Sequence, residues 1–186
     1  MLNATVVGTL TVDDDFIVSG FGYSNYMTVS DITYTPQTDD VIELNLRYKC
    51  TAYYNWGVVL IGWGTSAYDN PEFKDSSTSG FYNSNGFEWG TNNVSHQLGN
   101  WYRVKMTTYY KIGSSTQIKF AFSDDEGNTW QEYTFTGTIS SASKFKLNDM
   151  MIGNCIENRN QYLRGYVDMR NTNIKVNNQI IWQGVI

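Results

Sequence analysis

The sequence has very little cysteine, proline and histidine: two Cys, two Pro and one His in 186 residues. Two cysteines are too few for a disulfide-built scaffold, so we expect Cys50 and Cys155 to be buried thiols that form no disulfide. The pair is also too small for a zinc site, and His96 has no Cys near it in the sequence. Since the sequence places no Asp and Ser partners for His96, a catalytic triad is disfavoured and a surface-loop position is expected.

Long apolar runs and basic clusters are missing as well. No stretch of about 18 apolar residues occurs, so no membrane-spanning segment is expected. The first residues have neither the basic start nor the long apolar region of a secretory signal, which predicts synthesis in a cytoplasm without that signal. The net charge is −5, the pI is about 4.7, and no Lys/Arg run is present. This pattern disfavours nucleic acid as a partner.

Aromatic residues and glycines are plentiful, with 14 Tyr, 6 Trp and 16 Gly, and this composition favours strands joined by turns. The clearest strand is Val41–Cys50, where Ile42, Leu44, Leu46, Tyr48 and Cys50 alternate with polar residues. Trp101–Tyr110 alternates in the same way. Further strands are predicted at Val58–Trp63, Leu147–Gly153 and Leu163–Met169, with a final hairpin at Ile174–Trp182. The fold class expected is all-β: one antiparallel β-sandwich domain, 1–186, of the jelly-roll (concanavalin-A-like) kind.

A hairpin at Gln117–Tyr133 is the best-defined local element. Its turn has the spacing Ser-x-Asp-x-Gly-x-Thr-Trp from Ser123 to Trp130, which resembles the Asp-box hairpin. The resemblance implies a structural turn made by Ser123, Asp125, Gly127 and Trp130, with Gly127 at positive φ. Because Glu126 precedes Gly127, the turn is one residue longer than the commonest form.

The segment Gly64–Gly86 breaks the alternation and is expected to be an irregular binding loop. It and the residues after it combine rings with polar side chains of the kind that recognise sugars. The candidate glycan-binding residues are Tyr68, Asp69, Asn70, Tyr82, Asn83 and Trp89. The alternative is that most of these rings fill the core of the sandwich.

Several segments together resemble a laminin-G-like, concanavalin-A-like domain found in phage and prophage tail or virion proteins. They are Phe16–Met27, Trp101–Lys105, Ser123–Trp130, Tyr162–Asp168 and Asn173–Trp182. The resemblance implies a non-enzymatic structural or adhesion protein of the virion surface. Its partners would be other virion proteins or host surface glycans, and it could form a homo-oligomer.

Two other functions stay open. One is a stand-alone carbohydrate-binding lectin module. The other, less favoured, is a glycoside hydrolase, because the related glucanases carry Glu-x-Asp-x-x-Glu on one strand and the glutamates here are scattered. The exposed face of Trp101–Tyr109, with Trp101, Arg103, Lys105 and Tyr109, is suited to contact either protein or sugar.

Calcium is the one cofactor for which the sequence offers candidate ligands. Asp13 and Asp15 belong to an acidic triplet, and Asp168 matches the Gly-x-x-Asp signature of laminin-G-like relatives, some of which hold calcium at the sandwich rim. The triplet lacks EF-hand spacing, so a solvated turn is favoured there. For Asp168, a bond to backbone N–H groups at a turn or strand end is favoured.

Overall fold

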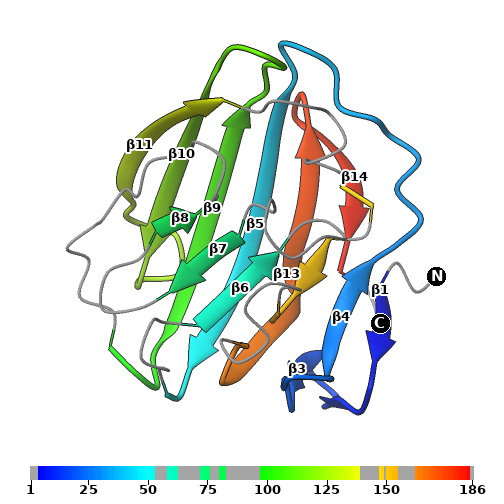
Figure 1. Ribbon diagram of the computed structural model, residues 1–186. Helices are drawn as coiled ribbons and strands as arrows, with labels where there is room; N and C mark the ends of the chain where they lie inside the picture. The colour runs from blue at the N-terminus through cyan, green and yellow to red at the C-terminus, as the bar shows by residue number, and fades with distance from the viewer. Residues whose placement is uncertain are drawn as a thin grey trace.

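The computed structural model describes residues 4–52, 58–62, 72–75, 80–82, 97–138, 147–148, 150–154 and 162–184. Every regular element in these ranges is a β-strand, and the strands form two antiparallel sheets (Figure 1). Both sheets contribute to one buried apolar cluster, so they pack as a sandwich. This confirms the predicted all-β antiparallel sandwich; the jelly-roll topology stays a prediction.

The larger sheet has eight strands. Its order is β11 (Gln131–Thr138), β10 (Ser115–Ser123), β9 (Trp101–Tyr109), β5 (Val41–Cys50), β13 (Gly165–Val176), β3 (Ile17–Ser19) and β2 (Thr11–Val12), with β14 (Gln179–Gln183) paired to β13. The long strands β5, β9, β10 and β13 lie next to one another at its centre. A broad and continuous outer surface results.

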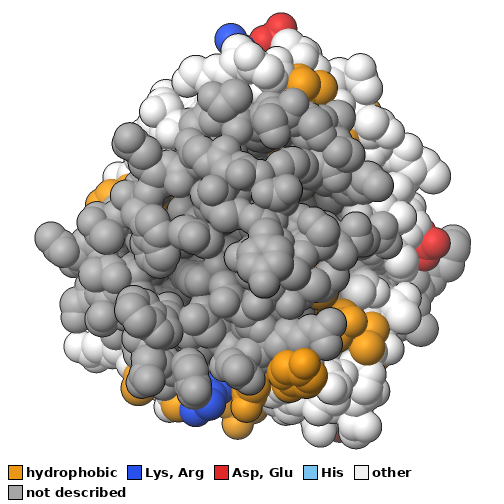
Figure 2. All heavy atoms as spheres, in the orientation of Figure 1, with side chains coloured by type: hydrophobic (Ala, Val, Ile, Leu, Met, Phe, Trp, Pro, Cys, Tyr) orange, Lys and Arg blue, Asp and Glu red, His pale blue; other side chains and the backbone are white. Residues whose placement is uncertain are grey.

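The smaller sheet has six strands and lies in front of the larger one in Figure 1. Its order is β1 (Ala4–Val7), β4 (Tyr26–Val29), β12 (Met151–Ile152), β6 (Val58–Gly62), β7 (Glu72–Asp75) and β8 (Gly80–Tyr82). Figure 2, seen from this side, shows described Lys and Arg side chains only near the rim.

The core lies between the sheets and follows from the alternation along β5. Its five predicted apolar residues are all buried, in the same cluster as Met27, Ile61 and Ile152 of the smaller sheet. Burying each such side chain stabilises the fold by about 1.5–3 kcal/mol. Because successive side chains of a strand point to opposite faces, the polar residues of β5 are directed away from the core.

The predicted final hairpin is confirmed. Asn177 and Asn178 connect β13 to β14 and have φ of 49° and 68°. Asn tolerates these positive values better than most residues, which makes a two-residue turn of this kind possible.

Three segment predictions were wrong. Gly64–Gly86 contains two strands, β7 and β8, whose four and three residues are too few to show alternation among Gly, Ser and Asn. Of the predicted strand Leu163–Met169, only Gly165–Met169 is a strand; it begins the longer β13, which continues to Val176 through a register shift between Asp168 and Asn173. Leu147–Gly153 forms only the two-residue strand β12.

Candidate functional site

The outer surface of the larger sheet carries a dense set of basic side chains, which we call the cationic face. It consists of Arg47 and Lys49 on β5, Arg103 and Lys105 on β9, Lys119 on β10 and Lys175 on β13. The pairing register places Arg47 opposite Arg103, Lys49 opposite Trp101, and Asn45 opposite Lys105. Residues opposite each other in antiparallel strands share a face, so these side chains are neighbours.

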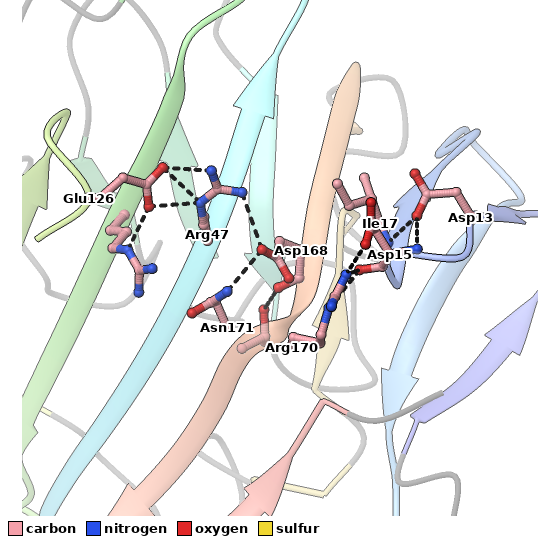
Figure 3. A network of polar contacts seen from close by, with 10 residues as sticks. Asp13, Asp15, Ile17, Arg47, Glu126, Asp168, Arg170 and Asn171 are labelled. Carbon is pink, nitrogen blue, oxygen red and sulfur yellow. Dashed lines mark hydrogen bonds and ion pairs between the residues drawn. The ribbon is translucent and has the colours of Figure 1, made fainter.

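Glu126 forms ion pairs with both of the facing arginines. Its carboxylate accepts hydrogen bonds from Arg47 Nη2 at 2.6 Å and Nε at 3.0 and 3.1 Å, and from Arg103 Nε at 3.0 Å. Figure 3 shows Glu126 against the side of the Arg47 guanidinium. The hydrogen bond from Arg47 is the main cause that lowers the pKa of Glu126, and the same bond raises the pKa of Arg47. Both shifts favour the charged forms of Glu126 and Arg47 at neutral pH.

Asp168 binds Arg47 from the other side. Arg47 Nη1 donates to Asp168 Oδ2 at 3.2 Å, and Asn171 Nδ2 donates to the same oxygen at 2.9 Å (Figure 3). Only 10% of the Asp168 side chain is exposed, and its Oδ1 is buried without a hydrogen-bond partner among the described residues. Arg47 is thus held between two carboxylates of different exposure.

Aromatic rings lie among these cations. The Arg47 guanidinium lies 4.2 Å from the centre of the Trp101 ring, and Lys49 Nζ lies 5.1 Å from it. Lys49 Nζ is also 4.5 Å from the Tyr166 ring centre, and Lys105 Nζ is 4.6 Å from that of Trp130. Such contacts hold the long basic side chains in place, each by about 0.5–1 kcal/mol at exposed sites.

The turn between β10 and β11 positions Glu126. Ser123 Oγ accepts a bond from Gly127 N at 2.8 Å, and Asp125 accepts bonds from Thr129 N at 2.9 Å and Thr129 Oγ1 at 2.7 Å. The Thr129 hydroxyl bond is the first cause that lowers the pKa of Asp125 to about 2. Glu126 and Gly127 have φ of 60° and 92°. Trp130 Nε1 donates to the Gly127 carbonyl at 3.0 Å.

A second group of polar side chains extends the cationic face along β5. Lys175 Nζ donates to Glu43 Oε1 at 3.1 Å, and Asn45 Nδ2 donates to the same oxygen at 2.9 Å. Burial pushes the pKa of Glu43 upward, but the bonds from Asn45 and Lys175 outweigh it, and the pKa is lowered. Asn45 Nδ2 also donates to Asn173 Oδ1 at 3.0 Å.

The predicted loop site falls largely outside the described residues. This applies to Tyr68, Asp69, Asn70, Asn83 and Trp89, and also to His96 and Cys155. Tyr82 ends β8, but its side chain is not among those described. Cys50 is a buried thiol of the core. By contrast, the predicted outer face of β9 lies at the centre of the cationic face.

The three calcium candidates have other partners. Asp13 Oδ1 accepts bonds from Asp15 N and Ile17 N, each at 2.9 Å, and so closes an exposed turn. Asp15 Oδ1 pairs with Arg170 Nη2 at 2.7 Å, and Asp168 pairs with Arg47 (Figure 3). In the part of the chain that is described, no three His, Cys, Asp or Glu side chains gather where they could hold a metal ion. Calcium stays a prediction.

Sequence reasoning missed Arg47, Glu126 and Tyr166 as possible site residues. Arg47 was assigned only to the polar side of its strand, and Glu126 only to a longer turn. The extra residue in the turn was the available signal, because it is the residue that reaches the arginines. Its partner could not be identified, since Arg47 is 79 positions away.

No protein-family model and no curated protein matches this sequence. The described residues also include no helix of the length and apolarity needed to cross a membrane.

Three solved structures show some similarity. The marine PL-14 alginate lyase from Aplysia kurodai is 10% identical, with a TM-score of 0.43, over 92% of this chain and 81% of that chain. The alginate lyase Aly36B is 11% identical, with a TM-score of 0.31, over 88% of this chain and 78% of that chain. A mutant of Aly36B in complex with an alginate tetrasaccharide is 12% identical, with the same TM-score and coverage.

These findings correct two linked predictions: a role in the phage virion and the absence of enzymatic activity. The prediction of a non-enzymatic structural or adhesion protein of the phage virion was wrong, since the three structures named are alginate lyases. The laminin-G-like resemblance stays a prediction. Identities of 10–12% and TM-scores below 0.5 assign no activity to this chain. Its function has to be argued from the cationic face itself.

Proposed function

We propose that this chain binds an acidic, uronate-type polysaccharide along the cationic face. The observation that carries the proposal is the placement of four cations, Arg47, Lys49, Arg103 and Lys105, on one face of two paired strands, where Arg47 and Lys49 lie against the Trp101 ring. The whole chain has a net charge of −5, so this concentration of positive charge is local. Guanidinium groups bind carboxylates through paired hydrogen bonds, and an indole face suits the C–H-rich face of a sugar ring.

Modest positive charge suits uronates better than nucleic acids. Three carboxylates, those of Glu43, Glu126 and Asp168, form ion pairs with cations of the face. A polysaccharide with one carboxylate per sugar needs a few spaced cations, whereas a nucleic acid backbone requires an unbroken basic surface.

One further observation favours cleavage of the bound chain. Lys49 and Tyr166 are paired across β5 and β13, and the ammonium lies 4.5 Å from the ring centre. Lysine and tyrosine are both able to transfer protons in catalysis. Next to arginines that pair with a uronate carboxylate, they are placed for β-elimination. One group takes the proton from the carbon beside the carboxylate, a C=C bond forms, the glycosidic C–O bond breaks, and the leaving oxygen takes a proton from the other group.

Hydrolysis by two carboxylates is a poorer fit to the same face. A glycosidase acid has to keep its proton near neutral pH, which requires a raised pKa. Glu126 and Glu43 instead have lowered pKa values, because Arg47 and Arg103 bind the first and Asn45 and Lys175 bind the second.

Calorimetry with alginate, pectate and carboxyl-reduced alginate tests the proposed binding. We expect binding of the two acidic chains and little binding of the reduced one. Arg103→Met should weaken binding, whereas Lys111→Met, which removes a cation bound to the exposed Asp39 at 3.9 Å, should not. The proposal fails if no acidic chain binds, or if the reduced chain binds equally well.

Cleavage is tested separately by the ultraviolet absorbance of the unsaturated sugar ends. We expect Tyr166→Phe and Lys49→Met to lower the rate of cleavage more than the affinity. If no unsaturated ends form although the acidic chain binds, β-elimination is rejected and binding stands.

A further inference from the structure

We infer that Arg47 and Arg103 form a carboxylate-binding subsite that Glu126 fills until a sugar carboxylate replaces it. This inference rests on the proposed function and names the chemical group recognised by the site. Glu126 would then act as an internal substitute for the ligand rather than as a group that binds sugar.

The geometry around Glu126 matches that of a bound carboxylate. Arg47 presents its Nε and Nη2 edge to both oxygens, and Arg103 adds its Nε to one of them. This planar two-point arrangement is how arginine recognises carboxylates in general, and it does not depend on the chain that carries the group. A uronate carboxylate at this position would make the same bonds.

The rest of Arg47 is fixed independently of Glu126. Its Nη1 is bonded to the nearly buried Asp168, and its guanidinium lies 4.2 Å from the centre of the Trp101 ring. The Arg47 side chain is only 17% exposed. Asp168 and Trp101 therefore keep the Nε and Nη2 edge directed at the position of Glu126 when Glu126 leaves.

Compared with the Arg47 side chain, the Glu126 side chain is weakly held. Its side chain is 51% exposed, so water competes for its bonds more than for the Arg47–Asp168 pair, whose side chains are 17% and 10% exposed. The hydrogen bonds that close its turn are made by Ser123, Asp125 and Thr129 and do not use its carboxylate. The side chain can therefore swing away while the turn stays formed.

Exchange of the Glu126 carboxylate for a ligand carboxylate avoids the free-energy cost of leaving the two arginines without a counter-charge. If Glu126 left with no replacement, two facing arginines would lose their shared counter-charge. A ligand carboxylate restores it, whereas a neutral sugar does not. A neutral sugar would displace Glu126 without restoring this charge and should bind with lower affinity. The arrangement therefore selects for acidic sugars.

The test compares Glu126→Gln with Glu132→Gln. Glu132 lies on the edge strand β11 and is exposed on the same outer face, since it pairs with Ala121 of β10, which pairs with Lys105. Glu132→Gln therefore gives the same charge change on this face without loss of a bond to either arginine. Calorimetry with an alginate tetrasaccharide at constant salt is expected to show binding about 2–10-fold tighter for Glu126→Gln, since the ligand no longer displaces an exposed ion pair. Glu132→Gln should stay close to the parent chain. Glu126→Asp, which keeps the charge but shortens its reach, should lie between.

The outcomes separate the inference from the proposed function. If the parent chain binds and Glu126→Gln binds equally or more weakly, the internal substitute is refuted while polyuronate binding stands. If neither the parent chain nor any variant binds, the proposed function fails and the inference fails with it. Urea unfolding of each variant confirms that the fold is intact.

Discussion

Replacing Arg47 with methionine removes the charge at the centre of the cationic face while keeping the length of the side chain. Asp168, 10% exposed, would then keep only the Asn171 bond on Oδ2. Leaving a nearly buried carboxylate without its charged donor costs about 1.5–3 kcal/mol. The half-exposed pair with Glu126 adds about 0.2–1 kcal/mol, and the contact with Trp101 about 0.5–1 kcal/mol. The expected loss in the free energy of unfolding is therefore about 2–5 kcal/mol.

Urea unfolding followed by tryptophan fluorescence measures this loss by linear extrapolation. For a chain of this size, the melting temperature should fall by about 4–20 °C. Arg170→Met is the matched control, because Arg170 is 52% exposed and its partner Asp15 is 78% exposed. With its contact to the Phe16 ring at 5.5 Å included, its loss should stay below about 2 kcal/mol. Arg47→Met combined with Asp168→Asn should recover part of the loss. Equal losses for Arg47→Met and Arg170→Met would refute the argument that the Asp168 pair is the stronger one.

Three further predictions concern acid, packing and salt. Bonds from Thr129 and Ser123 hold the pKa of Asp125 at about 2, below the ordinary 3.8, so its charged form stabilises the fold above about pH 4 and this stabilisation is lost as the pH falls toward 2. Asp125→Asn should remove that part of the acid-unfolding curve in circular dichroism. Gly153→Ala should cost about 2–5 kcal/mol in urea unfolding, because at φ +83° a Cβ would lie 2.2 Å from Phe21 Cδ1. Affinity for alginate, measured by calorimetry, should fall between about 0.1 M and 1 M salt as the screening length shortens from about 10 Å to about 3 Å.

The acid and packing predictions each have a control in the same chain. Asp124→Asn makes the same charge change at an exposed neighbour and should leave the acid curve unaltered. Gly99→Ala has a similar φ of +87° but no atom within 4 Å, so it should cost about 1–2 kcal/mol from the backbone alone. A Gly153→Ala cost no greater than that of Gly99→Ala, or an affinity for alginate independent of salt, would contradict the corresponding argument.

Local regularities in the sequence predicted much of the fold. The alternation along Val41–Cys50 predicted both the bounds of β5 and its buried face, and the paired asparagines predicted the β13–β14 turn. Both are properties of a few neighbouring residues and need no knowledge of the partner strand. Where strands are short, as in β7 and β8, or contain a bulge, as in β13, the local pattern was too weak and the predictions were wrong.

The sequence by itself determined that β9 presents Trp101, Arg103 and Lys105 on one face, because strand geometry sends alternate side chains to the same side. Only the tertiary structure decided that Arg47 lies opposite Arg103, with Glu126 bound to both and Asp168 behind. Arg47 is 79 positions from Glu126 and 121 from Asp168. Strand order and register set those distances, and they arise from packing the whole sandwich rather than from any short stretch of chain.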